Sequence, residues 1–271
     1  MELAPQVALP AVPPRPWSPV LAPLALVASF GCALLGGIVV AVIGALAGAS
    51  FAHPPPGITL TATVLQDAAF VLSAVFFASQ VARPRPEQFG LRRPAVGLLR
   101  ALGALGLGYA VFIAFSGAWT AALNVHDKQK LVEELGTNDN AVALVAVCLL
   151  TCVIAPICEE FFFRGFFFTS LRNWCGVWPA AVITGLVFGA IHVGSAPAAY
   201  LIPLAFFGFV LCIVYWKTGS LYPCIALHAL NNSIALGLTE HWRWQIPILT
   251  VSALAVIGLG LRSVARLTPA G

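Results

Sequence analysis

Long apolar segments recur along almost the whole chain and limit what it can fold into. Of its 271 residues, 60% are hydrophobic and only 9% are charged, and the mean hydropathy is +0.93. A soluble domain carries roughly 25% charged residues, so this composition excludes an ordinary soluble protein. Apolar runs of about 17–25 residues can each cross a bilayer as a helix, whereas a transmembrane barrel has short alternating segments. The pattern predicts an all-α polytopic membrane protein.

About eight transmembrane helices are expected from these runs. With the N-terminus in the cytoplasm, eleven of the 14 Lys and Arg residues fall on the cytoplasmic side, and only Lys128, Lys130 and Arg243 fall on the other. This bias follows the positive-inside rule and predicts that both chain ends face the cytoplasm, in a plasma membrane. The expected spans are 21–48, 58–82, 96–123, 141–160, 178–194, 198–216, 221–238 and 244–264.

One integral membrane domain is expected behind a short tail. Residues 1–19 are rich in proline and are expected to be disordered, and residues 20–267 are expected to form the membrane domain. The first apolar run exceeds a signal-peptide core, so it is predicted to be a span, with cleavage after Ala-Gly-Ala-Ser at 47–50 as the alternative.

The seven cysteines form no CxxC pair, so neither a disulfide nor a cysteine metal site is predicted. The net charge of +4 requires no nucleic-acid partner.

Two adjacent carboxylates interrupt the apolar run 141–171. A single helix of this length would extend about 46 Å at 1.5 Å per residue, so it is expected to tilt, to break near Gly165 or to emerge obliquely. Glu160 and Arg164 are spaced i,i+4, which predicts an ion pair on one helix face. Glu159 points about 100° away from that pair and is available for another partner. Charged groups at membrane depth are costly and mark functional sites, so Glu159 is the stronger candidate.

Further polar side chains lie on two later spans. His192 ends the apolar stretch that contains Phe188, and His228 shares a helix face with Asn232. A carboxylate beside an imidazole can deprotonate a water, while a second imidazole and an amide can stabilise an oxyanion. The same side chains could instead bind a divalent metal such as zinc. The chain contains neither HExxH nor GxSxG, so these signatures of other hydrolases are absent from it.

The order of these motifs resembles that of the CPBP family of intramembrane proteases. Glu159-Glu160 with Arg164, Phe188 with His192, and His228 with Asn232 follow one another over about residues 155–235. The family includes the CAAX prenyl endopeptidases, of which the Ras-converting enzyme is one, and bacteriocin-processing and self-immunity relatives. The resemblance implies eight helices around an intramembrane catalytic cavity that opens toward the cytoplasm.

The resemblance also implies a role for each matching residue. Glu159 would activate a water with the help of His192, and His228 with Asn232 would form the oxyanion site. Glu160 and Arg164 would support or position this site. The family is commonly named a metalloprotease, in which case Glu159, His192 and His228 would be the metal ligands; the rival is a glutamate-type mechanism without zinc, which the residues favour slightly. The implied substrate is a peptide or membrane protein, with prenylation left open.

Other interpretations compete with proteolysis. Buried Glu and His residues could relay protons in a transporter, although the chain shows no duplicated halves. A protease-like scaffold could also act in immunity or regulation without cutting.

Two further features are given a structural interpretation. Asp67, in the second span, is expected to be structural, and the phenylalanines of 161–168 are expected to face lipid or the core rather than an isoprenoid. The expected spans place Glu159 near the inner face and His192 near the outer end of a short span, so a boundary must shift or a helix must tilt for the two to meet.

Overall fold

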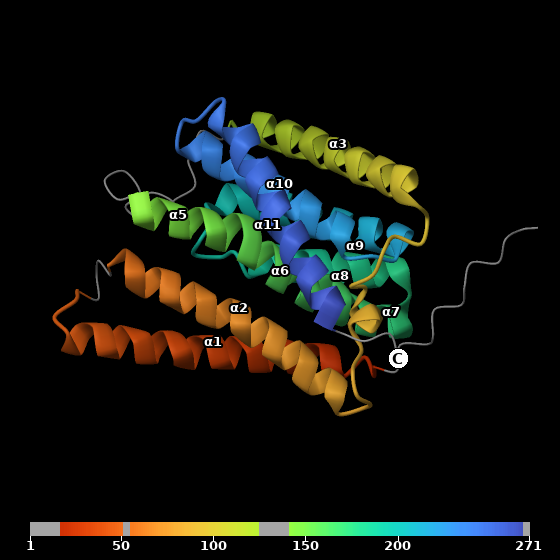
Figure 1. The fold of residues 1–271 in the computed structure, drawn as a ribbon, viewed down its shortest axis with the longest axis horizontal. Coiled ribbons are helices and arrows are strands. Elements are labelled where there is room, and N and C mark those ends of the chain that lie inside the picture. The colour runs from red at the N-terminus through yellow and green to blue at the C-terminus, as the bar shows by residue number, and fades with distance from the viewer. Residues whose placement is uncertain (1–16, 51–54, 125–140, 268–271) are drawn as a thin grey trace, which may run out of the picture.

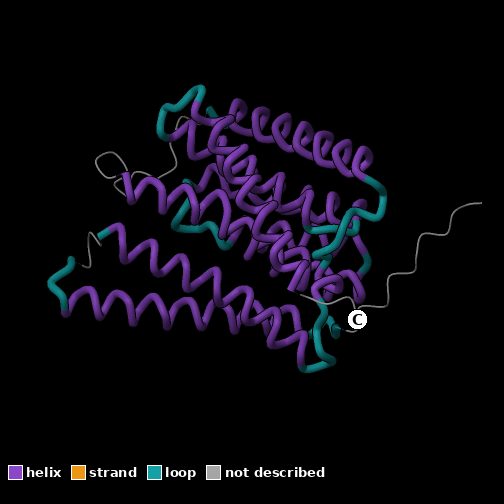
Figure 2. The backbone as a smooth tube through the Cα atoms, viewed as in Figure 1, coloured by secondary structure: helices purple, strands orange, loops and turns teal. Residues whose placement is uncertain are grey.

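The computed structural model describes residues 17–50, 55–124 and 141–267, and all regular structure in these ranges is helical (Figures 1 and 2). The first half contains α1 (Leu21–Leu46), α2 (Pro56–Ser79), the 3₁₀ helix η1 (Pro86–Phe89) and α3 (Leu98–Ala122). A long helix follows, made of α5 (Ala141–Leu149), η3 (Leu150–Ile154), α6 (Ala155–Glu160), η4 (Phe161–Phe168) and α7 (Thr169–Cys175). The chain then forms α8 (Val177–Ala190), η5 (Ala198–Tyr200), α9 (Leu201–Thr218), α10 (Tyr222–Thr239) and α11 (Gln245–Leu267).

Each of the eight expected spans has a helical counterpart, and six helices are long and apolar enough to cross a membrane. The six include the long helix 141–175 and exclude α8, which has 14 residues, and α10. The helix α10 carries His228, Asn231, Asn232 and Ser233, which lower its hydropathy. The protein is therefore a multi-pass membrane protein.

The expected boundary at residue 160 is wrong. The helix continues without a break from Ala141 to Cys175, through Gly165, over 35 residues. The two glutamates suggested a helix end, but the six phenylalanines between 161 and 168 extend the apolar run for two more turns. Five of them, Phe162, Phe163, Phe166, Phe167 and Phe168, are buried and form core packing. Glu159 therefore lies near the middle of the helix rather than at its inner end.

Two π-helical segments, η3 and η4, widen this long helix around the glutamates. In η3 the Ala155 N–H bonds to the Leu150 carbonyl, five residues back, so the next residue would bond to the carbonyl of Thr151. That next residue is Pro156, which has no N–H. The Thr151 carbonyl is therefore left without a partner from its own helix. Single π turns inside α-helices often accompany functional sites.

Helices from the first half of the chain flank those of the second half. The α1–α2 hairpin lies along one side, α3 lies on the opposite side, and the long helix, α8, α9 and α10 lie between them (Figure 1). Helices α8 and α9 pack most closely: a Cβ on Gly185 would lie 2.6 Å from the Ala205 carbonyl oxygen and 2.8 Å from the Phe209 nitrogen. Small residues at such contacts let helix backbones approach in a membrane.

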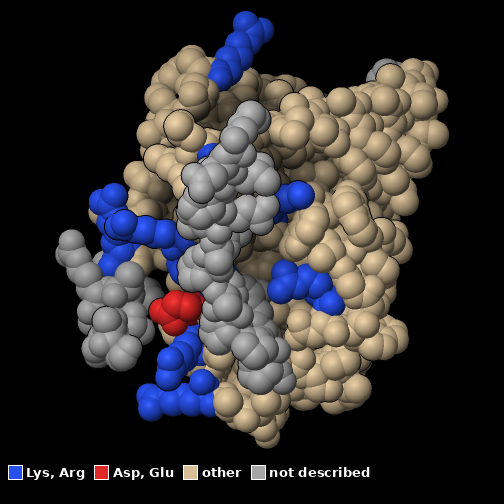
Figure 3. All heavy atoms as spheres, turned by 90° about the vertical axis from the view of Figure 1, so that its right-hand side faces the viewer, with Lys and Arg blue, Asp and Glu red and all other residues tan. Residues whose placement is uncertain are grey.

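The N-terminal and basic parts of the molecule meet at one end. Trp17, which belongs to the expected tail, is 2% exposed, and its ring lies 4.7 Å from that of Phe89; residues 1–16 lie outside the described residues. The segment after α2 bonds to the α9–α10 region, since the Tyr215 hydroxyl donates to the Phe89 carbonyl at 2.9 Å and Arg92 Nε donates to the Gly219 carbonyl at 3.0 Å. Lys and Arg side chains gather on this end of the molecule (Figure 3).

Candidate active site

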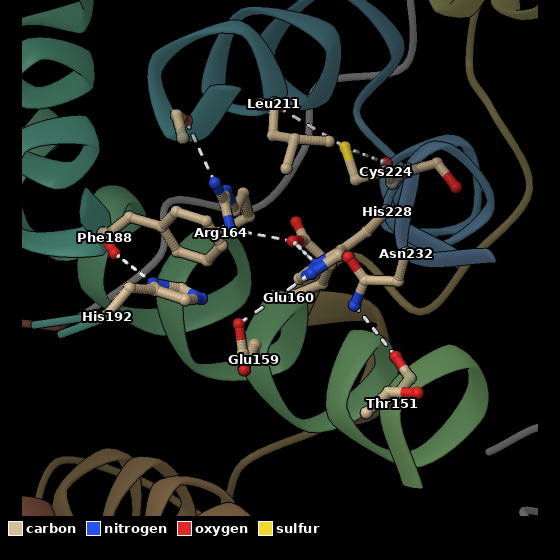
Figure 4. Close-up of polar contacts among 12 residues, drawn as sticks. Thr151, Glu159, Glu160, Arg164, Phe188, His192, Leu211, Cys224, His228 and Asn232 are labelled. Atoms are coloured by element: carbon tan, nitrogen blue, oxygen red, sulfur yellow. Dashed lines mark hydrogen bonds and ion pairs between the residues drawn. The ribbon is translucent and has the colours of Figure 1, made fainter. Parts of the chain in front are cut away.

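A buried ion pair forms the centre of the site. Arg164 Nη1 donates to Glu160 Oε1 at 2.7 Å, and both side chains are fully buried (Figure 4). The ion pair expected from the i,i+4 spacing is thus present. Arg164 Nη2 also donates to the Gly208 carbonyl at 3.0 Å, and its guanidinium lies 4.5 Å from the centre of the Phe188 ring. These contacts from α8 and α9 compensate for part of the cost of burying the charge.

Glu160 also fixes the orientation of His228. The same Oε1 atom that accepts from Arg164 lies 2.8 Å from His228 Nδ1. Because an ionised carboxylate can only accept, Nδ1 must carry the hydrogen, and in the neutral imidazole Nε2 keeps its lone pair. That Nε2 atom faces Glu159, 3.9 Å from its Oε2. Glu160 therefore presents His228 to Glu159.

His192 is held in the same tautomer from a different helix. Its Nδ1 lies 2.7 Å from the Phe188 carbonyl, which can only accept, so Nδ1 donates and Nε2 is free. The Phe188 ring lies close to both histidines, with its centre 5.0 Å from that of the His192 ring and 5.7 Å from that of the His228 ring. Both imidazoles therefore present an Nε2 lone pair when they are neutral.

The extended helix also explains how His192 reaches the depth of Glu159. The chain reverses at Gly176, and Glu159 lies 17 residues before this turn while His192 lies 16 residues after it. Two antiparallel helical stretches of nearly equal length therefore bring both residues to similar depth. The expected spans put Glu159 and His192 at opposite faces of the membrane because the fourth span was expected to end at residue 160.

Glu159 differs from its neighbour in having no tight partner. It is 8% exposed, and its Oε2 atom makes no hydrogen bond to any described protein atom. In Figure 4 its carboxylate points away from the Glu160–Arg164 pair and lies on the side of the two histidines. A buried carboxylate without a donor is costly, and such groups are concentrated at functional sites.

Asn232 is anchored to the carbonyl that Pro156 leaves free. Its Nδ2 donates to the Thr151 carbonyl at 2.8 Å, which joins α10 to the π-helical turn η3. The sequence pointed to Asn232 through its spacing from His228 but gave no sign of this partner. This contact uses one of the two amide hydrogens of Asn232.

The three expected metal ligands do not converge. Among the described residues, no group of three His, Cys, Asp or Glu side chains has the spacing that a metal ion requires. The tautomers would suit Nε2 ligation, but the one ion pair among these three residues joins Glu159 Oε2 and His228 Nε2 at 3.9 Å, and His192 takes part in none. The site is therefore described by its carboxylate and imidazole chemistry.

A pocket of about 310 Å³ lies elsewhere, between α3, α9 and α10. Its lining includes Tyr109, Phe112, Tyr200, Asn231 and Thr239, and it includes neither Glu159 nor the two site histidines. The catalytic cavity that the resemblance implies thus stays a prediction.

Comparison with known proteins places a family domain over this site. Residues 141–234 match the family model described as type II CAAX prenyl endopeptidase Rce1-like, a range that contains every expected site residue. A protein of Mycoplasma capricolum subsp. capricolum, described as uncharacterized, is 29% identical over 96 residues, which cover 35% of this chain and 28% of that protein. The chain thus matches less than a third of this relative's length. No solved structure matches the chain. Residues 141–234 of this multi-pass membrane protein therefore form an Rce1-like type II CAAX prenyl endopeptidase domain of the CPBP family.

Proposed function

We propose that the protein is an intramembrane endopeptidase that hydrolyses peptide bonds of membrane-associated substrates with a water activated by Glu159. One observation carries this proposal. Glu159 Oε2 is buried, has no hydrogen-bond donor among the described residues and lies 3.9 Å from the Nε2 atom of His228. A water that bonds to both atoms at about 2.8 Å fits this separation.

The first chemical step is attack by this water. Glu159 accepts one proton, and the Nε2 lone pair of His192 accepts a hydrogen bond from the other O–H. The water oxygen forms a bond to the peptide carbonyl carbon, and the carbonyl electron pair moves onto oxygen. General-base catalysis of this kind contributes about 10²–10⁴-fold.

The second step needs donors for the oxyanion and a proton for the leaving amine. The free amide hydrogen of Asn232 supplies one donor. His228 Nε2, which Glu160 at Nδ1 holds beside Glu159, supplies the other when it carries a hydrogen. The tetrahedral intermediate then collapses: the C–N bond breaks, its electron pair stays on nitrogen, and the Glu159 carboxyl returns its proton to the amine.

We infer further that the basic end of the molecule faces the cytoplasm, in a plasma membrane. The support is the gathering of Lys and Arg side chains in Figure 3 together with the positive-inside rule. The substrates proposed are peptides or membrane proteins with cleavage sites at membrane depth, and the family resemblance adds prenylated C-terminal peptides as the first class to assay.

The test is cleavage of farnesylated and unmodified membrane peptides by the protein purified in detergent. Glu159→Gln removes the base while keeping the shape, and we expect product formation to fall by at least about 100-fold. Glu87→Gln, the same change at an exposed glutamate of η1, should cleave like the wild type. Wild-type rates in Glu159→Gln would overturn the proposal. Chelation with metal analysis addresses the metal question separately, since activity retained without bound metal excludes a metal mechanism.

A further inference from the structure

The pocket between α3, α9 and α10 has no part in the hydrolysis described above. Its volume of about 310 Å³ is at the lower end of the range of about 300–1,000 Å³ that ligand sites occupy. It is open to the surroundings of the protein, since Ile113 and Leu238 in its lining are 49% and 63% exposed. Of the described residues that line it, none is charged. An occupant of this pocket is therefore a neutral group held at membrane depth.

Helix α10 carries the pocket and the active site on neighbouring faces. Ala235, which lines the pocket, follows His228 by seven residues, and two helical turns bring the two residues to the same side of α10. Asn231, also in the lining, directly precedes Asn232 of the site. At 1.5 Å per residue, the pocket residues of α10, from Asn231 to Thr239, extend from about 4 Å to about 16 Å beyond His228 along the helix axis. A chain that passes His228 can therefore continue into the pocket.

Two aromatic rings join the pocket to the site. The ring of Phe112, which lines the pocket from α3, has its centre 4.6 Å from that of Phe207 on α9. The Phe207 ring centre in turn lies 5.8 Å from that of His228. A group that contacts Phe112 in the pocket is thus separated from the catalytic imidazole by ring contacts alone.

The polar groups of the pocket suit a peptide backbone. Neither the amide of Asn231 nor the hydroxyl of Tyr109 bonds to a described residue. A peptide that is cut within the membrane exposes backbone N–H and C=O groups there, and each of them needs a partner. An asparagine amide and a tyrosine hydroxyl can each donate and accept. A lipid acyl chain has no use for such groups, and a charged lipid headgroup would find no counter-ion in this lining.

We propose that the pocket binds the extended, uncharged segment of the substrate next to the cleaved bond, with Asn231 and Tyr109 bonding to its backbone. An extended chain covers about 3.3–3.6 Å per residue, so the pocket holds roughly the second to the fifth residue from that bond. This inference rests on the proposed function and names the substrate class, a chain with apolar residues over this stretch.

Photo-crosslinking tests the occupant without requiring hydrolysis. An unmodified membrane peptide with a diazirine leucine at successive positions is bound to Glu159→Gln in detergent and irradiated, and the labelled residues are identified by mass spectrometry. We expect labels within 109–116, 200–204 and 231–239, and about fivefold less labelling when Asn231→Leu is added, the effect of losing one hydrogen bond. Labels only outside these ranges overturn the proposal. So does labelling of the pocket by a diazirine phosphatidylcholine and not by the peptide, which would identify a lipid site.

Substrate preference gives a second measurement. Ala235→Phe fills the pocket, and we expect the ratio of kcat/KM for peptides with leucine over those with glycine at these positions to fall by at least about 10-fold, the lower end of what one methylene contributes. Ala114→Phe, on the exposed face of α3 and outside the lining, is the matched control and should keep the wild-type ratio. An unchanged ratio in Ala235→Phe, with Glu159→Gln inactive, overturns the role of the pocket while the proposed function stands. If Glu159→Gln cleaves like the wild type, the proposed function itself fails, and the crosslinks still report where the peptide binds.

Discussion

The core built from the long helix, α8, α9 and α10 differs from the α1–α2 hairpin in having polar side chains that bond from one helix to another. In the hairpin, Ser29, Thr61 and Thr63 each donate to a carbonyl three or four residues back in the same helix. In the core, Arg164, His228 and Asn232 bond to other helices, across 44, 68 and 81 residues of sequence. A hydroxyl bonded within its own helix stabilises no helix contact, whereas a bond between helices holds two of them in one geometry.

The same contrast appears in burial. In the most apolar 18-residue stretch of α1, 6% of the residues are buried inside the protein, against 44% in the corresponding stretch of residues 198–218. The hairpin therefore presents most of its surface to lipid, and the core holds the site. Asp67 belongs to neither pattern, because it lies in the hairpin, is buried and has no bond within its own helix.

The largest effect is expected where the core holds its charges. Arg164→Ala leaves Glu160 buried without its cation, and we expect a loss of about 3–5 kcal/mol in unfolding free energy, measured by reversible unfolding in detergent. The paired change Glu160→Gln with Arg164→Met removes both charges and should recover most of this stability. Leu35→Ala, on the lipid-facing surface of α1, is the control and should change stability little. An Arg164→Ala protein as stable as Leu35→Ala would remove the distinction between the two regions.

A smaller effect is expected from adding volume to a helix contact. Gly185→Val drives a side chain into the backbone of α9, where a Cβ alone would lie 2.6 Å from the Ala205 carbonyl oxygen. Backbone atoms cannot rotate away, so we expect a loss of about 1–3 kcal/mol in the same unfolding measurement. Gly31→Val is the matched change in α1, where a Cβ would meet nothing within 4 Å, and it should be neutral or slightly stabilising. Equal losses at both glycines would contradict the assignment of α1 to the lipid-facing surface.

Sequence patterns predicted the parts of this arrangement that depend on side-chain type and local spacing. Span positions followed from the length of apolar runs, and the Glu160–Arg164 pair followed from i,i+4 geometry. The end of the fourth span did not follow, because two charges suggested a boundary while six phenylalanines continued the helix. Sequence spacing identifies a helix face but does not say where an apolar helix must stop.

The hydrogen-bond partners of the site residues could not be predicted from the sequence, for a different reason. His192, Arg164 and Asn232 bond to backbone carbonyls of Phe188, Gly208 and Thr151, and a carbonyl has no residue type that would mark it. Pro156 was a usable signal for the Thr151 carbonyl, provided that the π-helical register was known.

The smallest effect concerns this proline and tests whether one missing N–H directs a contact between helices. Pro156→Ala supplies an N–H that competes for the Thr151 carbonyl, so the bond from Asn232 should weaken. Asn232→Ala should cost about 0.6 kcal/mol in the native background, the average for hydrogen bonds between membrane helices, and close to nothing in the Pro156→Ala background. A double-mutant cycle by unfolding in detergent measures the coupling between the two positions, with Thr63→Ala in the hairpin as a control that should be additive with Pro156→Ala. If Pro156→Ala and Asn232→Ala are additive, the Thr151 carbonyl accepts from Asn232 whichever residue stands at position 156. The contact between α10 and the π-helical turn would then depend on the shape of the turn and not on the proline.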